Sequence, residues 1–145
     1  MSEVLAPGDV VLAASAPSKE AAIRQAGELL VRAGAVDETY VAAMLAREAS
    51  ISTAMGNFLA IPHGTEAAKG AIRRSALCLV RYDEPIDWAG QPVRVVVGIA
   101  GVGEEHLGIL SRIALVFADV EQVQRVLDAP TAAEVYAILQ QVNEE

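Results

Sequence analysis

The chain contains only two histidines, and the residues next to each could make its imidazole suitable for a role in a reaction. His63 stands between Pro62, which fixes the backbone, and Gly64, which has no Cβ and lets another molecule approach closely. An imidazole titrates near pH 6.5, so much of it is neutral at pH 7 and can act as a nitrogen nucleophile. We therefore expect His63 to be exposed and rigidly held. A lone histidine is more often structural, so this interpretation depends on its companions.

His106 and Arg47 are the two side chains that could assist His63. His106 lies at the predicted start of a helix, where free amide groups and partial positive charge favour an anion. Arg47 lies near the end of another predicted helix, and its planar guanidinium fits phosphoryl oxygens. Each also has a plainer interpretation, as an exposed first-turn histidine and as a solvated arginine at a helix end.

Together the three residues match the needs of phosphoryl transfer. Its transition state spreads charge over three equatorial oxygens, so it requires a neutral nucleophile, in-line geometry and positive donors. A phosphohistidine can also release its group, because the P–N bond is labile. The pattern therefore indicates a phosphoryl relay rather than a hydrolase.

Other residues support weaker hypotheses. A metal site could combine His63, His106 and Glu105, but their spacing lacks a local ligand motif. Cys78 lies in an apolar segment and is expected to be inert, and Trp88 is expected to belong to the core. The sequence has neither a P-loop nor a dinucleotide glycine signature.

The elements that must position these residues can be read from hydrophobic spacing and capping residues. Ser18 and Gly34 bound one expected helix, Asp37 can cap the next, and Thr131 with Glu134 forms a capping box. Two dipeptides, Ser52-Thr53 and Gly56-Asn57, have turn chemistry. We expect strands at 9–14, 58–61, 72–81 and 93–100, and helices at 19–33, 38–48, 106–118, 120–128 and 132–142. Buried strands mixed with helices predict an α/β fold: a single-domain mixed β-sheet flanked by helices on both faces.

Composition limits the class of protein. The 145 residues suit one domain, and 53% are hydrophobic, enough for a substantial core. The net charge of -8 argues against nucleic acid and anionic membranes; it suits a basic partner, or it only favours solubility. No apolar run approaches the ~18 residues of a membrane span, and the N-terminus lacks a signal-peptide pattern. The single cysteine, Cys78, cannot form an internal disulfide, which favours a cytoplasmic location.

Two runs carry a resemblance to a known family. Residues 44–48 (MLARE) and 51–65 (ISTAMGNFLAIPHGT) resemble the IIA domain of the mannitol/fructose class of the bacterial sugar phosphotransferase system. The resemblance covers nearly the whole chain, so residues 1–145 are expected to be one such domain. It includes the segments SKEAAIRQAGELLVRAGAV, PIDW, VVVGIA and EHL. Pro-His-Gly-Thr and the length of the chain most resemble the mannitol-specific branch.

The resemblance implies a role for each site residue. His63 would be phosphorylated on Nε2, His106 would hydrogen-bond the phosphoryl group or the imidazole, and Arg47 would neutralise charge in the transition state. Phospho-HPr would be the donor, and a cysteine of the EIIB domain of the sugar permease the acceptor. No cofactor, metal, nucleic acid or direct membrane insertion is implied.

Two alternative functions stay open, and two positions differ from the family pattern. The protein could be a regulatory phosphoprotein of the nitrogen-related type, or it could serve fructose or another sugar. Ala54 stands where the family often has an aromatic residue, and Phe58 where it often has a small or polar one. Both departures bear on sugar assignment and partner surface rather than on the phosphoryl role.

Overall fold

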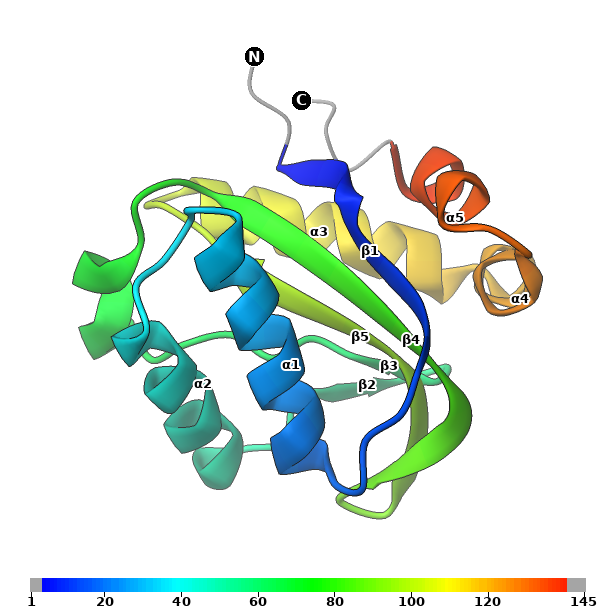
Figure 1. Ribbon diagram of the computed structural model, residues 1–145, viewed down its shortest axis with the longest axis horizontal. Helices are drawn as coiled ribbons and strands as arrows, with labels where there is room; N and C mark the ends of the chain where they lie inside the picture. The colour runs from blue at the N-terminus through cyan, green and yellow to red at the C-terminus, as the bar shows by residue number, and fades with distance from the viewer. Residues whose placement is uncertain (1–3, 141–145) are drawn as a thin grey trace.

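Five strands form one mixed sheet in the order β1-β4-β5-β3-β2 (Figure 1). The computed structural model describes residues 4–140. Strands β1 and β4 are parallel, β4 and β5 antiparallel, β5 and β3 parallel, and β3 and β2 antiparallel. The strands are β1 (Leu5–Ala14), β2 (Ala54–Gly56), β3 (Leu59–Ala60), β4 (Ala76–Trp88) and β5 (Gln91–Ala100).

Helices cover both faces of this sheet (Figure 1). One face carries α1 (Lys19–Arg32) and α2 (Thr39–Ser50). The other carries α3 (Glu105–Ala118), α4 (Val120–Asp128) and α5 (Ala132–Leu139). A 3-10 helix, η1 (Glu66–Ala71), follows the loop that contains His63. The predicted fold class, an α/β fold with helices on both faces of a mixed sheet, is confirmed.

The two cores follow from the period of two along each strand. In β4, Leu77 and Leu79 pack with α3, α4 and α5, whereas Cys78 and Val80 pack with α1 and α2. Strand β5 alternates in the same way, and most of its side chains are buried. A strand buried on both faces reads as a continuous apolar run, which is the pattern in the sequence.

Two of the predicted helix starts are confirmed by capping hydrogen bonds. The Ser18 Oγ accepts from Ala21 N at 3.2 Å, and the Thr131 Oγ1 accepts from Glu134 N at 3.2 Å. Gly34 follows α1 with a φ of +76°, a conformation that glycine adopts without strain. Caps of this kind hold the helix starts in place, because they satisfy amides that have no partner within the helix.

Some predicted boundaries are wrong. Gly56, expected in a turn, instead ends β2 (residues 54–56), a strand that was not predicted and that pairs with β3 across Asn57 and Phe58. Both turn residues have positive φ, 53° and 67°, as a two-residue hairpin turn of this type requires. The strand expected at 72–81 begins at Ala76 and continues to Trp88, because its charged second half pairs with β5 through a hairpin.

Other boundaries move by smaller amounts. Strand β1 begins at Leu5, which pairs with Leu77, and a register irregularity precedes Val10. Strand β3 is shorter than the expected 58–61 and covers only two residues. The helix expected at 132–142 ends at Leu139, and positions 141 and 142 lie outside the described residues.

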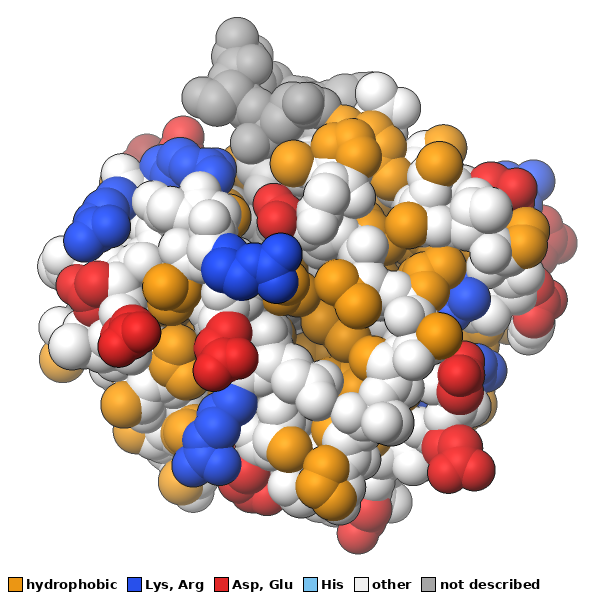
Figure 2. All heavy atoms as spheres, viewed as in Figure 1, with side chains coloured by type: hydrophobic (Ala, Val, Ile, Leu, Met, Phe, Trp, Pro, Cys, Tyr) orange, Lys and Arg blue, Asp and Glu red, His pale blue; other side chains and the backbone are white. Residues whose placement is uncertain are grey.

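The outer surface carries both signs of charge. Figure 2 shows acidic and basic side chains interspersed over the face that α1 and α2 cover. The net charge of -8 is therefore not matched by one uniform acidic patch on this face. Among residues 4–140, no helix has both the length and the apolar character to cross a bilayer.

Candidate functional site

Neighbouring strand ends bring the two histidines together. Strands β3 and β5 run parallel, so their carboxyl ends lie at the same edge of the sheet. His63 follows β3 and forms an isolated bridge with Ile99 of β5, whose N–H donates to Pro62 O at 3.0 Å. The chain then leaves β5 and enters α3 at Glu105. Strand register thus places His63 beside the start of α3, as is usual for sites in α/β sheets.

The imidazoles of His63 and His106 lie side by side. Their ring centroids are 5.3 Å apart, and the ring planes are tilted by 56°. Gly101 lets His106 lie close to the end of β5, because a Cβ at position 101 would lie 2.5 Å from the His106 Cα. The sequence predicted an exposed ring, but His63 is half-buried, because its loop lies against the end of β5. The predicted pairing of the two histidines is thus present in the structure.

A backbone hydrogen bond fixes the tautomer of His63. Its Nδ1 lies 2.9 Å from Ile61 O. A carbonyl oxygen can only accept, so this contact assigns the hydrogen to Nδ1. In the neutral ring the lone pair is then on Nε2, the ring nitrogen that could act as a nucleophile.

Burial lowers the pKa of His63 below its ordinary value near 6.5. The hydrogen bond to Ile61 and the carboxylate of Glu48 act in the opposite direction, and the charge of Arg47 lowers the pKa further. The net direction is downward, so His63 is mostly neutral at pH 7. A neutral imidazole is the form that can attack phosphorus.

An NMR titration would test this environment. We expect the His63 ring to titrate with a midpoint below 6.5 in the folded protein and near 6.5 in the chain unfolded by urea. Because the folded form binds the proton less tightly, protonation of His63 destabilises the fold as the pH falls below 6.5. A titration midpoint in the folded protein that is equal to or above the midpoint in the unfolded chain would contradict a lowered pKa for His63.

Arg47 is close enough for its charge to affect His63, and its guanidinium has a backbone partner of its own. It occupies the last turn of α2, and its Nη1 donates to Ile51 O at 2.8 Å. Its charge reaches His63 electrostatically. The guanidinium is thus held at the edge of the site by the segment that follows α2.

Tyr40 belongs to the site although its sequence pattern predicted only an inward-facing helix residue. Its hydroxyl donates to Ile99 O at 2.8 Å and accepts from Gly64 N at 2.9 Å. The ring packs so closely that a Cβ on Gly64 would lie 2.5 Å from Tyr40 Cε1. Tyr40 therefore ties the residue after His63 to the end of β5. The available signal was that a buried tyrosine hydroxyl usually has a partner.

The substitution Tyr40→Phe should weaken this tie without unfolding the protein. It leaves the Gly64 amide and one carbonyl acceptor without their partner, which costs about 1–3 kcal/mol of unfolding free energy. Tyr82→Phe is a matched control, because the Tyr82 hydroxyl donates to Gln25 Oε1 at 2.6 Å, away from His63. Urea unfolding should show a loss in both variants, whereas only Tyr40→Phe should shift the His63 ring resonances. Equal His63 spectra in both variants would contradict this role.

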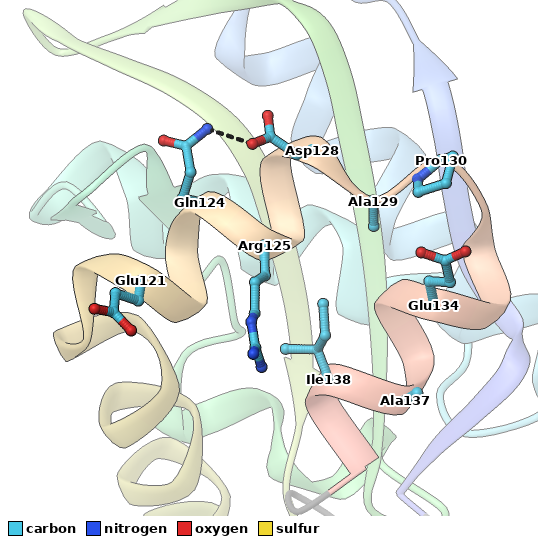
Figure 3. Close-up of a pocket in the computed structure, with 9 residues that line it drawn as sticks. All are labelled: Glu121, Gln124, Arg125, Asp128, Ala129, Pro130, Glu134, Ala137 and Ile138. Carbon is cyan, nitrogen blue, oxygen red and sulfur yellow. Dashed lines mark hydrogen bonds between the residues drawn. The ribbon is translucent and has the colours of Figure 1, made fainter.

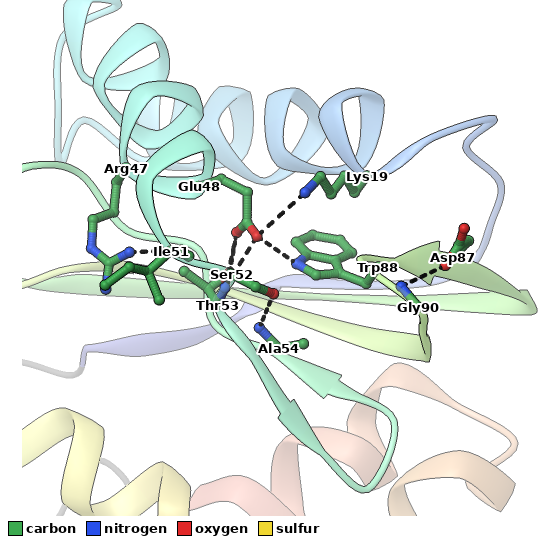
Figure 4. A network of polar contacts seen from close by, with 10 residues as sticks. All are labelled: Lys19, Arg47, Glu48, Ile51, Ser52, Thr53, Ala54, Asp87, Trp88 and Gly90. Carbon is green, nitrogen blue, oxygen red and sulfur yellow. Dashed lines mark hydrogen bonds and ion pairs between the residues drawn. The ribbon is translucent and has the colours of Figure 1, made fainter.

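A second residue without an assigned role in the sequence prediction is Glu48, which is only 4% exposed. Its carboxylate accepts hydrogen bonds from Thr53 and from Trp88 Nε1 (Figure 4). Trp88 is fully buried, as expected of a core residue. Glu48 stands next to Arg47 in the sequence, and that adjacency was the signal that could have drawn attention to it.

Two other hypotheses concern Cys78 as a reactive thiol and Glu105 as a metal ligand. Cys78 is fully buried, and burial raises the pKa of its thiol to about 12, so it stays protonated and unreactive. The hydroxyl of Ser75 donates to Glu105, the carboxylate considered for a metal site. Within residues 4–140, no group of three or more His, Cys, Asp or Glu side chains is arranged to hold a metal ion.

The two departures from the family pattern lie in the hairpin before His63. Ala54 pairs with Ala60 across β2 and β3. Phe58 is 38% exposed, and its carbonyl accepts from Arg94 N and Val95 N at 3.0 and 2.9 Å.

A separate cavity of about 650 Å³ lies between α4 and α5 (Figure 3). Arg125 and Ile138 point into the space between the two helices. None of its lining residues belongs to the histidine site; they are Glu121, Gln124, Arg125, Asp128, Ala129, Pro130, Glu134, Ala137 and Ile138. The chemistry expected of His63 therefore does not depend on this cavity.

Comparisons with known proteins agree with this geometry. The family described as "Phosphoenolpyruvate-dependent sugar phosphotransferase system, EIIA 2" matches residues 3–142. A mannitol-specific phosphotransferase enzyme IIA component from Halalkalibacterium halodurans is 50% identical over 141 residues, 97% of each chain. The complex of enzyme IIA mannitol and phosphorylated enzyme IIB mannitol from Escherichia coli matches with 32% identity and a TM-score of 0.85, over 91% of this chain and 94% of that one. The nitrogen regulatory protein IIA-Ntr from Neisseria meningitidis matches with 30% identity and a TM-score of 0.81, over 94% and 96%.

Proposed function

Because the chain belongs to the EIIA 2 family of the phosphoenolpyruvate-dependent sugar phosphotransferase system, we propose that it is a phosphocarrier that takes a phosphoryl group onto Nε2 of His63. The donor is phospho-HPr, and the acceptor is a cysteine of the EIIB component. The observation that supports this most directly is the Nδ1 contact with Ile61 O, which leaves Nε2 as the nucleophile.

Each transfer exchanges one bond to phosphorus for another. In the first step the Nε2 lone pair of His63 forms an N–P bond as the donor's bond to phosphorus breaks, and the donor keeps that electron pair. In the second step a cysteine thiolate of EIIB attacks phosphorus, and the N–P electron pair returns to Nε2. His63 keeps its Nδ1 hydrogen throughout, because Ile61 O holds it. No proton has to leave the imidazole in either step.

The neighbouring groups stabilise the migrating group. His106 lies with its ring centroid 5.3 Å from that of His63, so it can hydrogen-bond a phosphoryl oxygen or the active ring. Its place in the first turn of α3 adds the partial positive charge of a helix N-terminus. Arg47 supplies a full positive charge for the developing oxygens.

The proposed pathway is the uptake of mannitol. The relative from Halalkalibacterium halodurans is mannitol-specific and 50% identical, which favours this sugar over fructose or another one. The Escherichia coli complex shows an IIA domain of this fold bound to phosphorylated IIB, which supports EIIB as the partner. We also propose that residues 1–145 act as one EIIA domain in the cytoplasm, where the single cysteine stays reduced.

A regulatory role is the second candidate. The 30% identity to a nitrogen regulatory protein IIA-Ntr is the observation that favours it. The two roles differ in where the phosphoryl group goes. A transport carrier gives it to EIIB, whereas a regulatory protein keeps it as a signal that a target protein reads.

Reconstitution of the relay tests the proposal. The protein is incubated with phosphoenolpyruvate, Enzyme I and HPr, and mass spectrometry is expected to show one added phosphate on His63 that is acid-labile and alkali-stable. Adding a mannitol EIIB domain should then remove it. Transfer to a fructose EIIB at an equal rate would overturn the mannitol assignment, and retention of phosphate with every EIIB would favour the regulatory role.

A further inference from the structure

We propose that Glu48 is a positioning residue for phosphoryl transfer: its buried carboxylate fixes Thr53, and through Thr53 it holds the backbone that orients the His63 ring. Glu48 does not touch the reacting atoms in this role. The inference rests on the proposed function, because it concerns the same imidazole and the same transfer.

The carboxylate of Glu48 is buried and fully hydrogen-bonded. Thr53 N donates to Oε1 at 3.2 Å and to Oε2 at 3.1 Å, and the Thr53 hydroxyl also donates to Oε1 (Figure 4). Trp88 Nε1 donates to Oε2 at 3.1 Å, and Lys19 Nζ lies 3.8 Å from Oε2. These contacts come from α1, from β4 and from the segment after α2, so the carboxylate links Thr53 to two other elements of the fold.

A short series of hydrogen bonds connects Thr53 to His63. Ile61 N donates to Thr53 O at 3.0 Å. The next contact is His63 Nδ1 with Ile61 O at 2.9 Å. Glu48 fixes Thr53, Thr53 fixes the Ile61 peptide, and the Ile61 carbonyl sets the tautomer and direction of the imidazole. Only two backbone segments separate the carboxylate from the nucleophile.

The same segment also holds Arg47. The Arg47 Nη1 donates to Ile51 O, two residues before Thr53. Ser52 Oγ accepts from Ala54 N at 3.2 Å and stiffens the turn between them. Glu48 therefore stabilises one piece of backbone that contacts both the guanidinium and the strand before His63. A shift of about 1 Å in reacting groups can slow a reaction about 10²-fold.

The charge of Glu48 and its positioning of the backbone would have opposite effects on the rate at which His63 is phosphorylated. The carboxylate favours protonation of His63, so removing the charge leaves the ring more often neutral. If charge were the only contribution, Glu48→Gln would accept phosphate at an unchanged or higher rate. Positioning predicts a lower rate, so one variant separates the two explanations.

Two measurements on the full-length chain test the inference. A glutamine at position 48 must point an NH2 group at donors that need an acceptor, so Thr53 loses part of its anchorage. We expect Glu48→Gln to be phosphorylated by phospho-HPr at least ~10-fold more slowly than wild type. Nitrogen-detected NMR of the unphosphorylated protein should show that His63 is no longer held in the single Nδ1–H tautomer.

A second pair of variants covers the case in which Glu48→Gln does not fold. Thr53→Val keeps the volume but removes the hydroxyl that donates to Glu48, and it should slow phosphorylation about 3-fold or more. Thr53→Ser restores the hydroxyl and should restore the wild-type rate. The proposal is supported if Thr53→Val is phosphorylated slowly and Thr53→Ser at the wild-type rate. It is overturned if both variants are phosphorylated at the wild-type rate.

Two controls separate positioning from general destabilisation. Lys19→Met removes the 3.8 Å ion pair with the same carboxylate but leaves Thr53 held. Val126→Ala weakens the opposite core, where Val126 is fully buried. Both should be phosphorylated within about twofold of wild type, even where Val126→Ala loses more stability than Glu48→Gln.

The outcomes distinguish this inference from the proposed function. If wild-type protein accepts no phosphate, the proposed function fails, but the tautomer measurement still decides the role of Glu48. If Glu48→Gln and Thr53→Val keep the His63 tautomer and the phosphorylation rate of wild type, the positioning role is wrong.

Discussion

Replacing His63 with alanine should abolish phosphorylation by phospho-HPr. The contact of His63 Nδ1 with Ile61 O leaves Nε2 unprotonated in the neutral ring, and Pro62 and Gly64 flank this histidine in its loop. The half-buried ring is not part of either hydrophobic core, so the fold should survive. The unfolding free energy should change by no more than about 1 kcal/mol. Intact-protein mass spectrometry after incubation with the relay enzymes measures the result.

His106→Ala is the matched control for this experiment. It removes the other imidazole of the pair, 5.3 Å away between ring centroids, but leaves Nε2 of His63 in place. This variant should still gain one phosphate, at a reduced rate. An acid-labile phosphate on His63→Ala, in the same amount as on wild type, would show that the nucleophile has been assigned to the wrong residue.

Replacing Arg47 with alanine should slow transfer to and from His63 by about 10²–10³-fold without preventing the final phosphorylation. In the proposed transfer, the guanidinium would stabilise the negative charge on the equatorial oxygens of the migrating group. Because the His63 nucleophile stays intact, long incubation should still load one phosphate. Rapid-quench measurement of the first-order transfer rate gives the size of the effect.

Arg47→Lys isolates the contribution of the guanidinium. Lysine keeps the charge but lacks the planar fork that can hold Ile51 O and a phosphoryl oxygen together. We expect its rate to lie between those of wild type and Arg47→Ala. A wild-type rate for Arg47→Ala would place the arginine outside the transition state, as an ordinary helix-end residue.

Only part of the fold could be predicted from the sequence. The long helices were predicted to within a few residues, because their apolar spacing and their caps Ser18 and Thr131 act locally. Strand β2 was missed because its three residues become a strand only by pairing with β3. The second half of β4 was missed because charged residues there are tolerated only when a partner strand continues beside them.

The sequence by itself determined which groups could do chemistry. His63 in its Pro-His-Gly loop, His106 at a helix start and Arg47 at a helix end are local features, and residue type and neighbours are enough to predict them. The family resemblance followed from the same short runs.

The tertiary structure decided how those groups are held. The tautomer of His63 depends on the exact path of two residues of backbone, and its lowered pKa on how much of the ring is covered. Tyr40 meets Ile99 across 59 positions of sequence, and Glu48 meets Trp88 across 40. Contacts over such separations exist only after the sheet has set its register, because no local pattern specifies which distant groups will meet. The sequence was thus enough to predict His63 as the candidate nucleophile, and only the folded structure shows the contacts that orient its ring.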